Sequence, residues 1–380
     1  MAALTEEQSL IRDQAKSWAT EKAPVGSFRK MRDSGIPERF EGQTWESMIE
    51  MGWTGILIPE TYGGSDLGYL TFGVVLEELG RQLTASPLLA SSLVGTSAIL
   101  LGGNEEQKQA YLPKLIDGSE ILTLAVDEGP RHDPVKTALA ANKTASGYEL
   151  SGTKFMVLEG MAATTFVVVA RSSGAAGESQ GLSLFLVPAN AQGVSREAVH
   201  TMDNRGYATV QLNGVSVANE ALLGAADEGN QLLEAVLDRG RAGLGAEMIG
   251  TASQAFDMTL EYLKTREQFG RVIGSFQALG HRAAELYSGM ELARSCAESA
   301  LQALDAGAEG VALAELSSLS KCRVGEYLHS MSNQLIQIHG GIGMTDEFDA
   351  GLYLKRARAL ETIYGNRSFH RDRYARALGF

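Results

Sequence analysis

The chain has 380 residues, of which 44% are hydrophobic and 21% are charged, a composition typical of a globular protein rather than a disordered or disulfide-stapled one. Its net charge of −13 at neutral pH argues against nucleic acid as a partner, because nucleic-acid-binding surfaces need clustered basic residues. The sequence contains two cysteines and no apolar stretch long enough for a membrane span. We therefore expect a cytoplasmic protein without a membrane partner.

The residues up to about 120 have the pattern of helices. Thr5-Glu-Glu-Gln8 resembles a capping box in front of an apolar-periodic stretch. Further amphipathic stretches follow near 76–79 and at 105–116, and the turn-rich segment 59–65 separates them. These patterns predict an N-terminal helical domain over residues 1–120.

From 121 to 227 the pattern changes to short strands. The segments 148–154, 165–170 and 182–187 are rich in β-branched and aromatic residues, with Gly, Pro, Asn and Ser clusters between them. The glycine-rich segment 174–181 is typical of a hairpin tip. This region is predicted to be a middle β-domain of the barrel or sandwich kind.

Helical periodicity returns after residue 228. Three long segments at about 230–265, 277–305 and 308–338 are rich in Ala, Leu, Glu and Arg, and a shorter one lies near 346–358. Their lengths predict a C-terminal four-helix bundle over residues 228–380. The fold class is therefore α+β and multidomain, with helices first, strands second and helices last.

The C-terminal block carries an arginine and glycine pattern that could hold a nucleotide. Arg266-Glu-Gln-Phe-Gly270 precedes Phe276-Gln277, and Gln337-Ile-His-Gly-Gly-Ile-Gly343 follows later. The arginine and glutamine could serve a pyrophosphate and an adenine, while the glycine pair lets backbone N–H groups approach phosphate. The alternative is a helix break with a surface Arg–Glu pair. P-loop and Rossmann patterns are absent, and the six histidines lack metal-ligand spacing, so no metal site is expected.

These motifs, together with Pro59-Glu-Thr-Tyr-Gly-Gly, Gly152-Thr-Lys and Ile363-Tyr364, resemble those of the acyl-CoA dehydrogenase family over essentially the whole chain. The resemblance implies a FAD flavoprotein oxidoreductase of acyl-CoA catabolism. Such an enzyme introduces a double bond between Cα and Cβ of an acyl-CoA and passes the electrons to an electron-transfer flavoprotein. It also implies a homo-dimer or tetramer, or a hetero-oligomer with a second acyl-CoA dehydrogenase subunit.

The resemblance also assigns site residues. The ADP half of FAD would be held across a subunit interface by residues of the C-terminal block, namely Arg266, Phe269, Gln277, Gln337, Gly340 and Gly341. Ser368 would reach the adenosine portion, and Arg241 would contact the acyl-CoA substrate. The alternative for Arg241 is a pair with Asp238 at the start of a helix.

The usual catalytic base is missing from both positions that the family uses. Dehydrogenation needs a carboxylate to remove the α-proton, yet one family position holds Gly365 and the other holds Gly240. The flavin-contacting segments also depart from the family pattern. The loop there reads Val126-Asp-Glu-Gly-Pro-Arg-His-Asp133, and Leu158 stands where a hydroxyl residue is usual. The catalytic residue is therefore unknown from the sequence.

Several interpretations stay open. The chain is the base-lacking subunit of a heteromeric enzyme, or a substitute carboxylate acts, with Glu361, Glu159 and Asp127 as candidates. A third interpretation is non-oxidative elimination or desulfination of an acyl-CoA, which needs no α-proton base. The last is a non-catalytic structural subunit that has lost FAD, and the retained nucleotide motifs argue against it.

Overall fold

The computed structural model describes residues 4–380, which form two compact units. The first, here called the helical unit, consists of the residues up to 29, 69–84 and 241–380. The second, here called the sheet unit, consists of residues 30–68 and 85–240. Along the chain, helices precede the strands and return after them, so the expected fold class is confirmed. The expected domain boundaries near 120 and 227 stay a prediction.

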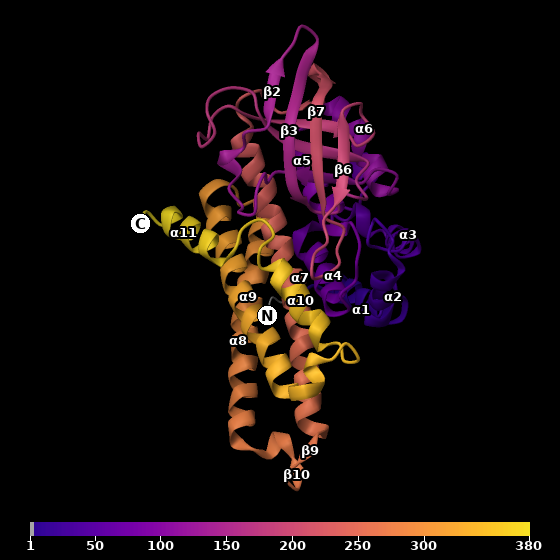
Figure 1. Cartoon of the computed structure of the whole chain (residues 1–380), viewed down its shortest axis with the longest axis vertical. Helices are drawn as coiled ribbons and strands as arrows, with labels where there is room; N and C mark the ends of the chain where they lie inside the picture. The colour runs from indigo at the N-terminus through magenta and orange to yellow at the C-terminus, as the bar shows by residue number, and fades with distance from the viewer. Residues whose placement is uncertain (1–3) are drawn as a thin grey trace. The chain divides into compact units, whose positions relative to one another are not determined.

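Within the described residues, the sheet unit is built on one sheet of eight strands in the order β6-β7-β3-β2-β4-β5-β8, with β1 pairing in parallel with β4. The strands are β1 (Leu122–Ala125), β2 (Ala140–Lys143), β3 (Gly147–Val157), β4 (Thr165–Arg171), β5 (Leu182–Pro188), β6 (Val194–Ala198), β7 (Ala208–Ala218) and β8 (Leu222–Leu223). β4 is buried along its whole length and β5 up to its last residue, which explains why both are nearly continuous apolar runs. Figure 1 shows β3, β7 and β6 side by side.

Short helices complete the sheet unit. They are α3 (Gly42–Glu50), the π-helical segment η3 (Leu88–Gly95), α5 (Thr96–Gly102) and α6 (Glu105–Ile116). α6 begins with a capping box between Asn104 and Gln107. The Gln107 amide also donates to the carbonyls of Glu220 and Leu222, at 2.9 and 3.0 Å, and so connects α6 to the last strand.

The helical unit contains the long helices. They are α1 (Glu6–Lys22), α4 (Gly68–Arg81), α8 (Gln277–Asp305), α9 (Gly310–His339), α10 (Ala350–Leu360), α11 (Arg367–Ala377) and the part of α7 (Gly229–Thr265) beyond residue 240; α2 (Val25–Ser34) contains the boundary at residue 29. The predicted capping box is confirmed, because Thr5 and Gln8 exchange side-chain to backbone hydrogen bonds. α9 packs against α8, α10 and α11, and Figure 1 shows α8 and α9 running side by side.

α4 and α7 cross with their backbones in direct contact. A Cβ atom added at Gly80 would overlap the carbonyl oxygen of Glu247, and one added at Gly250 would overlap the carbonyl oxygen of Glu77. The hydroxyl of Thr251 donates to the carbonyl of Gly80 at 3.3 Å across the same crossing. The close approach therefore depends on glycine in both helices.

Candidate functional site

The hairpin after α7 presents an aromatic side chain to solvent. Its strands β9 (Glu267–Gln268) and β10 (Arg271–Val272) pair antiparallel, and the turn holds Phe269 at φ +56° and Gly270 at φ +76°. Phe269 is 89% exposed, and its ring lies edge-on to Phe276 with 6.2 Å between the centroids. The turn geometry thus holds a large apolar ring away from the protein's own core.

The end of α9 lies beside this hairpin. The ring of His339, the last residue of α9, stacks on Tyr262 in the last turns of α7 at 4.3 Å between centroids. The backbone N–H of Arg266 donates to the carbonyl of Tyr262, one turn earlier. The structure therefore brings the 266–277 segment and the 337–341 segment to the same end of the bundle, where Figure 1 shows β9 and β10.

This end of the bundle has exposed side-chain donors and open backbone at the residues expected to hold the ADP half of FAD. Gly340 has φ +62°, and a Cβ atom added at Gly340 or Gly341 would meet no atom within 4 Å. The side chains of Arg266, Gln277 and Gln337 are exposed and make no hydrogen bond or ion pair within residues 4–380. A free guanidinium suits a pyrophosphate, and free amides suit the edge of an adenine.

Ser368 does not belong to this cluster within one protomer. It is exposed in the first turn of α11, and its neighbour Arg367 pairs with Glu326 of α9 at 2.7 Å. Glu326 precedes Gln337 by eleven residues, or about 16 Å of helix. Ser368 could approach a nucleotide at the bundle end only from a second copy.

Arg241 is buried rather than presented to solvent. Its exposed fraction is 0%, and its Nε donates to the carbonyl oxygen of Tyr364 at 3.2 Å. Its guanidinium also lies 5.4 Å from the centre of the Phe369 ring. The imidazole Nε2 of His370 lies 3.1 Å from the same Tyr364 carbonyl. In this conformation Arg241 and His370 both hold the backbone that leads into residue 365.

Gly365, one of the two vacant base positions, has no room for a side chain. A Cβ atom there would lie 2.5 Å from Cδ1 of Phe369 and 2.8 Å from Nε2 of His370. The residue also has φ +111°, a conformation that residues with a Cβ rarely adopt. Gly240, the other vacant position, is a buried residue of α7. The site thus lacks the base at 365 and also lacks the space for it.

The three candidate substitute carboxylates are paired or buried. Glu361 binds the guanidinium of Arg358 at 2.6 Å and the imidazole of His329 at 3.0 Å. Asp127, in the sheet unit, holds His132 Nδ1 at 2.9 Å. Glu159, in the same unit, is only 4% exposed. None of the three is an exposed carboxylate without a partner.

Lys321 is a buried cation that sequence reasoning missed. It is 2% exposed on α9, and its Nζ donates to the carbonyl of Leu360, the last residue of α10, at 2.7 Å. Burial, assisted by the positive charge of Arg241, lowers the pKa of Lys321 to about 7. The spacing of Lys321 could have indicated its burial, because it lies four residues after Ser317 and three before Val324 on the buried face of α9. Lys321 therefore anchors the start of the segment that carries Gly365.

Lys154 and the loop 126–133 form a buried polar contact within the sheet unit. Lys154 is fully buried, and its Nζ donates to the carboxylate of Glu128 at 2.7 Å and to the carbonyl of Val126 at 3.0 Å. Burial lowers the pKa of Lys154. Leu158 is 5% exposed, so its side chain is packed among its neighbours.

Comparison with known proteins identifies the family of the chain. Sequence profiles of the N-terminal, middle and C-terminal domains of acyl-CoA dehydrogenases match residues 5–119, 127–216 and 227–379. The chain belongs to the acyl-CoA dehydrogenase family. FAD is the cofactor of these oxidoreductases, and the free donors at the bundle end fit its ADP half.

Three relatives illustrate the similarity. The mitochondrial isovaleryl-CoA dehydrogenase of Solanum tuberosum is 32% identical over 340 residues, which are 88% of this chain and 82% of the relative. A structure described with the electron-transferring flavoprotein of Acidaminococcus fermentans is 28% identical, with a TM-score of 0.92 over 100% of this chain and 99% of the other. A chain of the ChsE4–ChsE5 complex of Mycobacterium tuberculosis is 26% identical, with a TM-score of 0.89 over 100% and 99%.

Candidate membrane-spanning helices and metal clusters are both lacking from residues 4–380 of this family member. No helix between residues 4 and 380 combines the length and the apolar character that crossing a bilayer requires. The same residues contain no group of three His, Cys, Asp or Glu side chains placed to hold a metal ion.

Proposed function

We propose that this chain is the base-lacking subunit of a heteromeric, FAD-dependent acyl-CoA dehydrogenase. The observation that supports this role is the filled space at Gly365, where Phe369 and His370 take the volume that a glutamate would need. The reaction removes the α-proton of a CoA thioester to a carboxylate and the β-hydrogen as hydride. In this proposal the partner subunit supplies the carboxylate, and the hydride acceptor would be FAD, held by the residues named below.

The chain's own residues have binding and positioning roles in this proposal. Arg266, Gln277 and the open backbone at 340–341 hold the ADP half of the cofactor, and Phe269 covers it at the interface. Arg241 and Lys321 fix the two carbonyls at the ends of the 360–364 segment and so keep Gly365 in place.

The family and two of the relatives support the proposed partners. The ChsE4–ChsE5 relative is a complex of two chains, which supports a second acyl-CoA dehydrogenase subunit as the partner here. The relative described with an electron-transferring flavoprotein supports such a protein as the electron acceptor. Two free cysteines fit the reducing cytoplasm as the location.

Purification of the chain alone and together with its native neighbours tests the proposal. We expect flavin absorbance in the co-purified complex, and acyl-CoA-dependent reduction of an acceptor dye by the complex but not by the chain alone. Full turnover by the chain alone would contradict the heteromeric role and favour a substitute carboxylate. Absence of flavin from both preparations would favour a structural subunit, and elimination without dye reduction would favour non-oxidative chemistry.

A further inference from the structure

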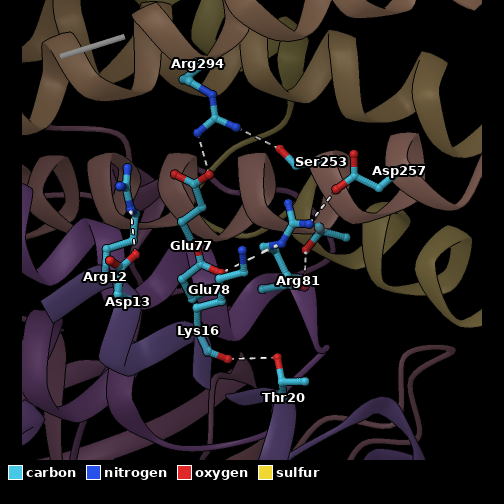
Figure 2. Close-up of polar contacts among 12 residues, drawn as sticks. Arg12, Asp13, Lys16, Thr20, Glu77, Glu78, Arg81, Ser253, Asp257 and Arg294 are labelled. Atoms are coloured by element: carbon cyan, nitrogen blue, oxygen red, sulfur yellow. Dashed lines mark hydrogen bonds and ion pairs between the residues drawn. The ribbon is translucent and has the colours of Figure 1, made fainter. Parts of the chain in front are cut away.

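The helical unit contains a cavity that the proposed dehydrogenase function does not use. Its volume is about 320 Å³, at the lower end of the range for small-molecule pockets. Residues of α1, α4, α7 and α8 line it, and Figure 2 shows the polar side chains around it. The hairpin, the end of α9 and Gly365 do not take part in its lining.

One side of the cavity is apolar. Val74 of α4, Ile249 of α7 and Leu301 of α8 line it and are each at most 7% exposed. A ligand with a hydrocarbon group would bury that group against this surface at a gain of free energy. The apolar surface alone does not identify the ligand, so the polar groups decide its class.

Glu78 of α4 lines the cavity with a buried carboxylate that accepts no hydrogen bond from residues 4–380. It is 7% exposed, and its one ion pair is to Nε of Arg81 at 3.8 Å, beyond hydrogen-bond reach. Arg81 instead donates to Asp257 at 2.5 Å, as Figure 2 shows. Burial raises the pKa of Glu78, as expected for a desolvated carboxylate. A buried carboxylate without a donor favours a ligand that brings N–H groups.

The adjacent carboxylate has its donors from the protein. Glu77 binds the guanidinium of Arg294, which also donates to Ser253 at 2.9 Å. The fold thus supplies a hydrogen-bond donor to Glu77 but none to the neighbouring Glu78 within residues 4–380. It leaves Glu78 as the one of the two that can accept from a ligand.

A free cation lies on the α1 side of the same cavity. Lys16 is exposed, and its ammonium makes no ion pair or hydrogen bond within residues 4–380. It is close enough to Glu78 for its charge to oppose the rise in the pKa of that carboxyl. The lining as a whole has four cationic side chains and four carboxylates, so a ligand without net charge suits it best.

We propose that this cavity binds an α-amino acid with an apolar side chain. Its ammonium group donates to Glu78, its carboxylate accepts from Lys16, and its side chain packs against the surface formed by Val74, Ile249 and Leu301. A zwitterion meets all three requirements at once, whereas a simple amine or a simple carboxylate leaves one of the two charged groups of the cavity without a partner.

Calorimetric titration of the purified full-length chain with L-leucine tests the proposal, together with two analogues. Leucinamide lacks the carboxylate, and isocaproate lacks the ammonium group. We expect saturable binding of L-leucine. Each analogue should bind at least about tenfold more weakly than L-leucine, since each loses one hydrogen-bonded charge pair. Equal binding of either analogue, or no saturable binding of L-leucine at millimolar concentration, would overturn the proposal.

Two variants test whether L-leucine binds in this cavity. Glu78→Gln and Lys16→Met should each weaken L-leucine binding by about tenfold or more. Lys22→Met, on the same helix but outside the lining, should leave the affinity unchanged and is the matched control. Lys16 is exposed, so its variant should fold even if the buried one does not. Unchanged affinity in the Lys16 variant would contradict the proposed pose, and neither flavin nor a partner subunit is needed for the measurement.

Discussion

Replacing Gly365 by alanine tests the claim that the base position is filled. The methyl group would lie 2.5 Å from Phe369 and 2.8 Å from His370, and overpacking of this kind costs about 1–3 kcal/mol. The backbone at φ +111° adds about 1–3 kcal/mol of strain for any residue with a Cβ. We therefore expect Gly365→Ala to lower the free energy of unfolding by about 2–6 kcal/mol in total.

Urea unfolding followed by circular dichroism measures this loss, and a double variant separates its two parts. In the Phe369→Ala background part of the steric cost should vanish, which gives a coupling energy of about 1–2 kcal/mol between the two sites. Gly351→Ala is the control, because its added methyl meets no atom within 4 Å inside α10. It should be neutral or stabilising by about 0.5–1 kcal/mol. If Gly365→Ala were as stable as that control, Phe369 and His370 would not occupy the space that a side chain at 365 needs.

Three further predictions concern other parts of the chain. The pKa of Lys321 is about 7 in the fold and near its ordinary value when unfolded, so the unfolded state binds more protons between these values. The free energy of unfolding should therefore rise above pH 7 by about 1 kcal/mol per pH unit. Urea titrations at several pH values measure this rise, and Lys321→Met should remove the contribution of Lys321 to it. Arg266→Ala should weaken FAD binding about 10–100-fold in a fluorescence titration, whereas equal loss in Lys264→Ala would contradict a specific contact. Gly250→Ala should cost about 3 kcal/mol or more in thermal unfolding, because its methyl overlaps a backbone carbonyl of α4; a wild-type melting temperature would show that the helices can separate.

Local patterns predicted most of the fold. The capping box at Thr5, the helix at 105–116 and the three long C-terminal helices follow from spacing and capping chemistry that act within a few residues. β4 and β5 were recognisable for the same reason, because a strand buried on both faces is apolar throughout.

The environment of the candidate site could not be predicted in this way. Local patterns do not reveal that α4 packs closely on the part of α7 beyond residue 240, where Gly80 and Gly250 each meet a backbone carbonyl of the other helix. The burial of Arg241 and Lys321 is equally non-local, since both side chains donate to backbone carbonyls of segments that follow much later in the chain. The vacancy at Gly365 was visible in the sequence, whereas its occupation by Phe369 and His370 depends on the turn into α11.

The packing around Gly365 also limits how this chain could evolve. A single codon change that restores glutamate would place the new side chain against Phe369 and His370, so the folded state would lose stability before any activity returned. Recovery of a self-sufficient enzyme would need at least one compensating change in α11 beforehand. For the proposed base-lacking subunit, this packing would make reliance on the partner's carboxylate easier to keep than to reverse.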